Sequence, residues 1–315
     1  MKTRYLIEPA LANRIDLDAS GGLTDEIITI LRNHENDIGA RDWPRFALDG
    51  VEIGDAVACG HVADAAPPLL FCRPQGSEVT PVILHIHGGG FIFSSAREAD
   101  QANQLYALAH GCAVLSVDYR RAPEHPYPAA IDDCYAALHW LYDNAPELQV
   151  DSNRVVVMGE SAGASLAAAL CHRVRDAGGP KIAAQILVYP MLDDRTSDLE
   201  PHHEFVGETV WNRDRNRYAW GSYLNGQEEP FSSHAVPARA TDFTALPPAS
   251  IFVGALDLFL EESLEYGRRL TRAGIPVELH VYRGAYHGFD NIADAKATLA
   301  FKNDLSRSLR EALFS

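Results

Sequence analysis

The sequence predicts an α/β protein with a mostly parallel central sheet and helices on both of its faces. From about residue 57 onward, short apolar runs alternate with helical patterns, and this alternation is typical of parallel strands joined by crossover helices. The short runs are apolar at nearly every position, as in strands that are covered on both faces. With 315 residues, of which 47% are apolar, the chain is long enough to bury such a core.

Six apolar runs are the predicted strands of the parallel part of the sheet. They cover residues 81–87, 113–119, 154–159, 183–190, 249–256 and 276–282. An earlier pair of runs, 55–63 and 67–73, is separated by a short turn segment and predicts an antiparallel hairpin at one edge of the sheet.

Helices are predicted between these strands, and several of them end near a glycine, which is typical of a helix C-terminus. They cover residues 98–110, 128–144, 162–176, 258–273 and 294–314. A further helix is predicted over 24–34, with Thr24 as its N-terminal cap. Residues 194–245 break the alternation because they carry many charges but no continuous apolar strand, so we expect an insertion that lies over the sheet.

Composition argues against two classes of partner and predicts a cellular location. The chain has 27 basic and 43 acidic residues, and the net charge of −16 repels phosphate backbones and anionic lipid surfaces, so we expect no nucleic-acid and no membrane partner. The amino terminus lacks the apolar stretch of a secretory signal, and no window of about 18 apolar residues occurs. The five cysteines form no CxxC pair. We therefore expect a cytoplasmic protein.

The residues after the strand at 154–159 predict a nucleophile. Residues 159–163 read Gly-Glu-Ser-Ala-Gly, fit the pattern GxSxG and run directly into a helix. A serine on a tight turn from strand to helix needs small residues two positions before and after it. The first N–H groups of the helix would also face the charge that develops near Ser161. Ser161 is therefore the candidate nucleophile.

Three consecutive glycines follow the strand at 81–87. The segment His87-Gly-Gly-Gly-Phe91 allows the backbone to turn back with its N–H groups exposed, which is what an oxyanion hole needs. The candidate donors are the N–H groups of Gly88, Gly89 and Ala162. No phosphate-binding pattern can be written through these residues.

A serine nucleophile needs a base and an acid that orients the base. Asp257 and His287 each follow a predicted strand, and the chain order serine, acid, histidine is one in which such triads occur. His287 has the alternative interpretation of a hydrogen-bonded structural histidine. Asp257 has the alternative role of capping the helix at 258–273, and one carboxylate can fill both roles.

Other histidines suggest a metal site only weakly. His85 alternates with His87 on one strand, and His202 and His203 are adjacent in the insertion, but no acidic or cysteine ligand stands at a recognisable spacing. We expect no metal and no cofactor.

Taken together, these motifs resemble the hormone-sensitive-lipase branch of the α/β-hydrolases, the bacterial esterases marked by HGGGF and by a GxSAG elbow. Further similar stretches are residues 118–130, 189–192, 257–262 and 287–289, so the resemblance covers about residues 50–315. Two positions depart from it: many relatives carry Asp in place of Glu160 and Leu in place of Arg121.

The resemblance implies an α/β-hydrolase fold with a helical cap. It also implies a carboxylic-ester hydrolase with Ser161, Asp257 and His287 as triad and with Gly88, Gly89 and Ala162 as oxyanion hole.

We expect two parts of the chain, an amino-terminal cap segment over 1–50 and a catalytic domain over 51–315 with a cap insertion at about 194–245.

The substrate is expected to be a small-molecule ester with a short acyl chain. Two alternatives stay open on the sequence alone. An amide or formamide hydrolase would use the same triad, and a non-catalytic small-molecule receptor on the same fold is known in the gibberellin receptors. Relatives often pair through edge elements of the sheet, so a homodimer is a further expectation.

Overall fold

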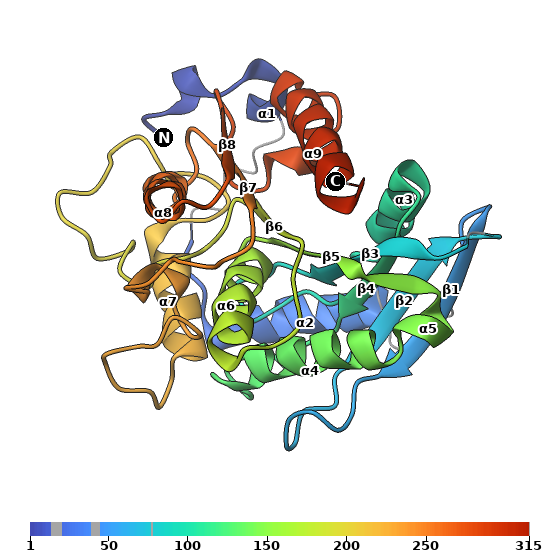
Figure 1. Cartoon of the computed structure of the whole chain (residues 1–315). Helices are drawn as coiled ribbons and strands as arrows, with labels where there is room; N and C mark the ends of the chain where they lie inside the picture. Colours follow the sequence, from blue (N-terminus) through green and yellow to red (C-terminus); the bar gives the residue numbers. More distant parts are fainter. Residues whose placement is uncertain (14–20, 39–44, 77, 315) are drawn as a thin grey trace.

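The computed structural model describes residues 1–13, 21–38, 45–76 and 78–314, and it contains one eight-stranded sheet in the order β1-β2-β4-β3-β5-β6-β7-β8 (Figure 1). β1 and β2 are antiparallel, as are β2 and β4, and all other neighbours are parallel. The strands are β1 Val51–Val57, β2 Pro68–Pro74, β3 Thr80–Ile86, β4 Ala113–Val117, β5 Val150–Glu160, β6 Ala184–Val188, β7 Ala249–Gly254 and β8 Val277–Tyr282.

Helices cover both faces of this sheet. One face carries α3 and α9, and the other carries α4, α6 and α8 (Figure 1). The longer helices are α2 Asp25–Ile38, α3 Asp100–His110, α4 Ala129–Asp143, α6 Ala162–Ala177, α7 Arg213–Tyr223, α8 Leu260–Arg272 and α9 Lys296–Phe314. Short helical turns lie at η1 Arg4–Leu6, α1 Pro9–Ala12, α5 Ala145–Leu148, η3 Pro237–Arg239 and η4 Phe289–Asn291. The predicted fold class is confirmed.

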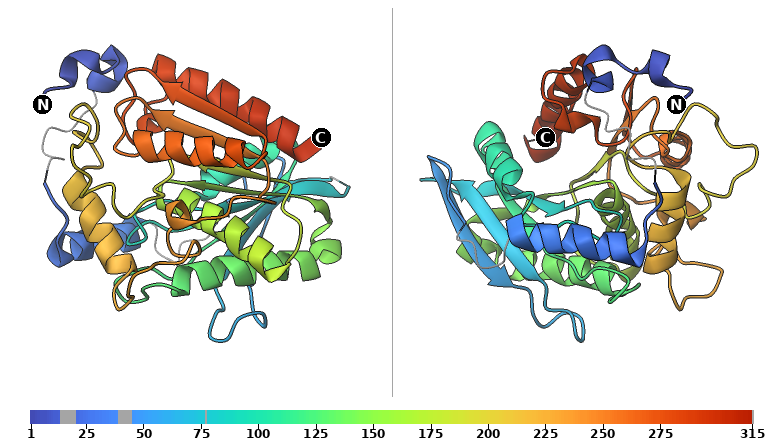
Figure 2. Two further views of the ribbon diagram at one scale, coloured as in Figure 1. Left: turned by 60° about the vertical axis from the view of Figure 1, so that its left-hand side comes forward. Right: turned by 180° about the vertical axis from the view of Figure 1, so that it is seen from behind.

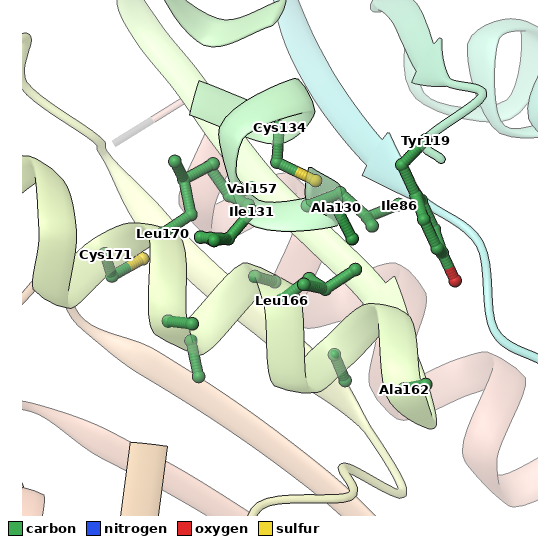
Figure 3. Packing of buried hydrophobic residues seen from close by; sticks show 14 of the residues in the cluster. Ile86, Tyr119, Ala130, Ile131, Cys134, Val157, Ala162, Leu166, Leu170 and Cys171 are labelled. Atoms are coloured by element: carbon green, nitrogen blue, oxygen red, sulfur yellow. The ribbon is translucent and has the colours of Figure 1, made fainter. Parts of the chain in front are cut away.

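The buried parts of the central strands are mostly apolar because they face a core on each side. In β5, Val155 and Val157 belong to the core with α4, α6 and α8, whereas Val156 and Met158 belong to the core with α3 and α9. Figure 3 shows the first of these cores, in which Leu166 of α6 lies among side chains from α4 and the sheet. This double burial fixes β5 and α6, and with them the turn that joins them.

The edge hairpin forms as predicted, but its first strand is shifted. Val51–Val57 pairs residue by residue with Pro68–Pro74, so the connection covers residues 58–67. The prediction of a strand at 55–63 was therefore wrong in its bounds. Residues 58–67 carry Gly60 and Pro67, which favour a loop over a continued strand.

Helices α2 and α7, which are far apart in the sequence, lie side by side, as both views in Figure 2 show. The Tyr218 hydroxyl of α7 donates a hydrogen bond to Asp25 of α2 at 2.5 Å. Arg32 of α2 donates to the carbonyl oxygen of Ile92 at 2.7 Å, just after the three glycines. The amino-terminal segment and the insertion therefore meet beside the glycine loop. Among the described residues, no helix combines the length and the apolar character needed to cross a lipid bilayer.

Candidate active site

Ser161 lies at the tight turn between β5 and α6, and its backbone has a φ of 53°, in the left-handed region. This turn needs glycine at both flanking positions, because a Cβ at Gly163 would lie 2.1 Å from the carbonyl oxygen of Ile86, and one at Gly159 would lie 2.4 Å from the Gly163 carbonyl carbon. The Ser161 N–H donates to the carbonyl oxygen of Val188 at 2.9 Å. The sharp turn directs the hydroxyl away from the sheet and toward the loops beyond the strand ends.

The side chains of Ser161, His287 and Asp257 form one chain of hydrogen bonds. Ser161 Oγ lies 2.9 Å from His287 Nε2, and His287 Nδ1 lies 2.9 Å from Asp257 Oδ2. All three residues are buried, and Asp257 is 0% exposed. The other carboxylate oxygen of Asp257 accepts a hydrogen bond from the Phe259 N–H at 3.0 Å at the start of α8. The carboxylate therefore both orients the imidazole and accepts a hydrogen bond from the backbone at the start of α8.

The glycine loop is held by a tyrosine. The Tyr119 hydroxyl lies 3.0 Å from the carbonyl oxygen of His87 and 3.1 Å from that of Gly88. In a trans peptide the N–H points opposite to the C=O, so this contact turns the N–H groups of Gly88 and Gly89 away from Tyr119. Gly89 has a φ of +100°, and a Cβ there would lie 2.0 Å from the carbonyl oxygen of Phe93, so the turn requires glycine.

A cavity of about 440 Å³ opens at Ser161. Its lining includes the three glycines, His287 and, from the insertion, Val210 and Trp211. The Trp211 N–H donates to the carbonyl oxygen of Thr209 at 2.6 Å, which closes a three-residue turn around Val210 at a φ of 59°. This strained turn brings Trp211 against Gly90, where an added Cβ would lie 2.5 Å from the indole ring.

Residues 83–291 match a family described as alpha/beta hydrolase fold. The chain belongs to this family. It is 37% identical over 216 residues to Esterase LipI of Mycobacterium tuberculosis, a match that spans 66% of this chain and 65% of that protein. It is 31% identical over 300 residues to the carboxylic ester hydrolase LipN of the same organism, spanning 93% and 78% of the two chains.

Two solved structures are similar over nearly the whole of this α/β-hydrolase. A structure named Bacterial Heroin Esterase has a TM-score of 0.90 at 34% identity and covers 99% of this chain and 100% of that one. Esterase LipW from Mycobacterium marinum has a TM-score of 0.86 at 33% identity and covers 100% and 98%. The predicted resemblance to the hormone-sensitive-lipase-like α/β-hydrolases is confirmed.

Sequence reasoning missed several residues that shape the site of this hydrolase. Tyr189 packs edge-on against the His287 ring at 4.7 Å between ring centroids, and Phe259 does so at 5.1 Å. Trp211 lies 6.1 Å from the same ring. Tyr119 and Tyr189 stand in stretches that the resemblance covers, but nothing in the spacing of the sequence shows which ring or carbonyl they contact. Trp211 lies in the insertion, where no periodic pattern marks it.

The histidines that suggested a metal site have other partners. His85 Nε2 lies 3.0 Å from a carboxylate oxygen of Glu160, and His87 Nδ1 lies 2.9 Å from the Gly88 carbonyl oxygen. His202 is exposed and lies 3.4 Å from Glu200. Within the described ranges, no three His, Cys, Asp or Glu side chains are arranged to hold a metal ion.

Replacing Gly163 with alanine is expected to destabilise the fold, because the new methyl group would overlap backbone atoms that belong to the sheet and the glycine loop. We expect a loss of at least about 3 kcal/mol in the free energy of unfolding, measured by urea denaturation. Gly221→Ala in α7 is the matched control, since nothing lies within 4 Å of its added Cβ, and it should stabilise the protein by about 0.5–1 kcal/mol. Equal effects at the two positions would contradict the packing described for the elbow.

Tyr119→Phe removes the hydroxyl that holds the glycine loop while keeping the ring. We expect kcat for p-nitrophenyl acetate to fall about tenfold with little change in KM. If the N–H groups of this loop are the oxyanion donors predicted above, their displacement weakens stabilisation of the transition state more than binding of the ester. Tyr127→Phe, whose hydroxyl contacts Ser232, is the control and should keep kcat within about twofold. An unchanged kcat in Tyr119→Phe would show that the hydroxyl does not position the loop.

Proposed function

We propose that this α/β-hydrolase is a serine esterase that hydrolyses short-chain carboxylic esters through an acyl-enzyme at Ser161. The observation that carries the proposal is the hydrogen-bonded chain from Ser161 through His287 to Asp257, which opens onto a cavity of about 440 Å³ beside a glycine loop. This arrangement supplies a nucleophile, a base, an orienting acid and backbone donors within one site.

The proposed mechanism begins with the imidazole. Asp257 accepts a hydrogen bond from the N–H group at Nδ1 of His287. The lone pair of Nε2 therefore faces the Ser161 hydroxyl and takes its proton as Oγ attacks the ester carbonyl. The N–H groups of Gly88, Gly89 and Ala162 would then hold the oxyanion, with Ala162 at the N-terminus of α6. His287 returns the proton to the leaving alcohol, and a water molecule repeats the same steps on the acyl-enzyme.

The preference for short acyl chains rests on the walls of the cavity. Trp211 stands against the glycine loop, and the packing of α2 beside α7 supports a cap made of the amino-terminal segment and the insertion. The volume of the cavity lies near the lower end of the usual range for ligand pockets.

The test is a series of p-nitrophenyl esters from acetate to palmitate. We expect kcat/KM to be highest for acetate or butyrate and to fall steeply beyond. A maximum at palmitate would contradict the proposed chain length, and no hydrolysis of any member would contradict the esterase activity itself.

The predicted enzyme class agrees with the relatives, which carry the names esterase and carboxylic ester hydrolase. No observation favours the amide or formamide alternative. The receptor alternative is not favoured either, because a receptor has no need of a histidine within hydrogen-bond distance of the serine.

Location and assembly stay predictions. Four of the five cysteines are buried and all five are free, which supports a reducing, cytoplasmic environment. A small-molecule ester is the proposed partner, and a homodimer is a further proposal that rests on the family resemblance alone.

A further inference from the structure

We propose that the cavity at Ser161 selects esters that carry a protonated amine, an inference that rests on the esterase activity proposed above. The charged residues that line the cavity are Glu98, Glu160 and Asp290, and no lysine or arginine lines it within the described ranges. Acidic clusters occur on many surfaces, but these three residues line the cavity that the substrate must enter. Four further features of the lining point to a cation.

Glu160 lies directly before Ser161, lines the cavity and contacts a histidine. His85 Nδ1 lies 3.0 Å from Ser116 Oγ and 3.2 Å from the side-chain nitrogen of Asn103. On the other side of the ring, His85 Nε2 lies 3.0 Å from a carboxylate oxygen of Glu160. No lysine or arginine among the described lining residues pairs with this carboxylate.

Asp290 is a second carboxylate in the lining, and no lysine or arginine lies beside it among the described lining residues. It accepts a hydrogen bond from the Tyr189 hydroxyl at 3.0 Å. Burial raises the pKa of Asp290, and the negative charge of nearby Glu160 raises it further. A cation in the cavity would compensate for the lost hydration of the buried carboxylate and would reduce the repulsion between Asp290 and Glu160.

His87 presents a buried acceptor to the same cavity. Its Nδ1 lies 2.9 Å from the carbonyl oxygen of Gly88, which can only accept, so Nδ1 carries the proton. Burial lowers the pKa of His87 to about 3, so the ring is neutral and Nε2 holds a lone pair. His87 is 2% exposed, and its Nε2 has no hydrogen-bond partner among the described residues. A lone pair in this position needs an N–H or O–H donor.

Aromatic rings complete the lining. Phe93, Tyr106, Tyr189 and Trp211 all border the cavity. Ring faces attract organic cations, and they favour an alkylammonium group over a strongly hydrated metal ion. The lining thus combines negative charge, a buried lone pair and aromatic surface, which together suit an alkylated ammonium group that still carries an N–H.

The experiment compares two esters of nearly equal shape, 2-(dimethylamino)ethyl acetate, which is protonated at pH 7, and its carbon analogue 3-methylbutyl acetate. We expect kcat/KM to be at least about tenfold higher for the amine at low ionic strength, and the ratio to fall as salt is added. Hydrolysis of both esters with a ratio of one or less would overturn the inference and leave the esterase activity intact.

Binding to the Ser161→Ala protein, measured by calorimetry, separates selectivity from turnover. We expect the amine ester to bind at least about tenfold more tightly than its carbon analogue. If neither ester is hydrolysed by the parent protein but this preference in binding holds, the esterase proposal fails while the cation site stands. Equal binding overturns the cation site whatever the activity.

Two substitutions test the carboxylates with minimal change of shape, Glu160→Gln and Asp290→Asn. Each should lower the amine-to-carbon ratio of kcat/KM at least about fivefold, because each removes one charge and keeps an acceptor oxygen. Glu261→Gln is the matched control, since Glu261 is exposed on α8 and does not line this cavity. The test uses only the amine-to-carbon ratio of kcat/KM, because a general loss of activity lowers both values and leaves their ratio unchanged. A ratio that stays constant in both variants would overturn the assignment.

Discussion

Ser161→Ala is expected to lower kcat for p-nitrophenyl butyrate by about 10⁴- to 10⁶-fold while leaving the fold unchanged. The hydroxyl lies 2.9 Å from His287 Nε2 and is the proposed attacking group, so its removal leaves only binding and the backbone donors to assist the reaction. Initial rates measured with the purified protein, together with its circular dichroism spectrum, provide the test.

The matched control for this substitution is Ser165→Ala, one turn further along α6. Ser165 is also buried, but its N–H donates to the carbonyl oxygen of Ser161 and its hydroxyl takes no part in the chain to His287. It should keep kcat within about threefold of the parent, because the substitution leaves the proposed acyl-transfer groups in place. Loss of activity in both variants to the same degree would indicate a structural cause rather than loss of the nucleophile.

The second large effect is expected for Asp257→Asn, with a fall in kcat of about 10⁴-fold. An asparagine can present its NH₂ group to Nδ1, which favours the imidazole tautomer with its proton on Nε2, so that no lone pair faces Ser161. The geometry of the three side chains is otherwise retained. The measurement is kcat for p-nitrophenyl acetate at pH 7 and above.

Glu261→Gln serves as the control for Asp257→Asn, because it also removes one carboxylate near the start of α8 but lies exposed to solvent. It should keep kcat within about twofold. An Asp257→Asn variant with activity near that of the parent would mean that the carboxylate acts only through its contact with the Phe259 N–H at the helix start.

Much of the fold could be predicted because its signals are local. The central parallel strands carry continuous apolar stretches, such as residues 155–158 of β5. The turn at Ser161 is marked by glycines whose added Cβ atoms would overlap backbone atoms. The approach of Asp257 and His287 to Ser161 could be anticipated because the carboxyl ends of parallel strands share one edge of the sheet. These predictions depend on the order of elements, which the sequence carries directly.

The remaining features could not be predicted because they depend on contacts between distant segments. Helix α7 shows little apolar periodicity, and it is stabilised by the Asn212 side chain, which accepts from the Arg215 N–H, and by burial of Trp220 and Tyr223. The position of Trp211 depends on the turn around Val210. No sequence pattern marks a turn of this kind, and none shows which part of the structure the residue after the turn will contact.

The most direct measurement of the central claim is covalent labelling with a fluorophosphonate, followed by peptide mass mapping. We expect one molecule of reagent to attach to Ser161, activity to be lost in proportion to labelling, and an excess of a short ester to slow the reaction. Labelling should vanish in Ser161→Ala and slow strongly in Asp257→Asn. Attachment at another residue, or an active protein that does not react, would contradict the claim that Ser161 is the nucleophile.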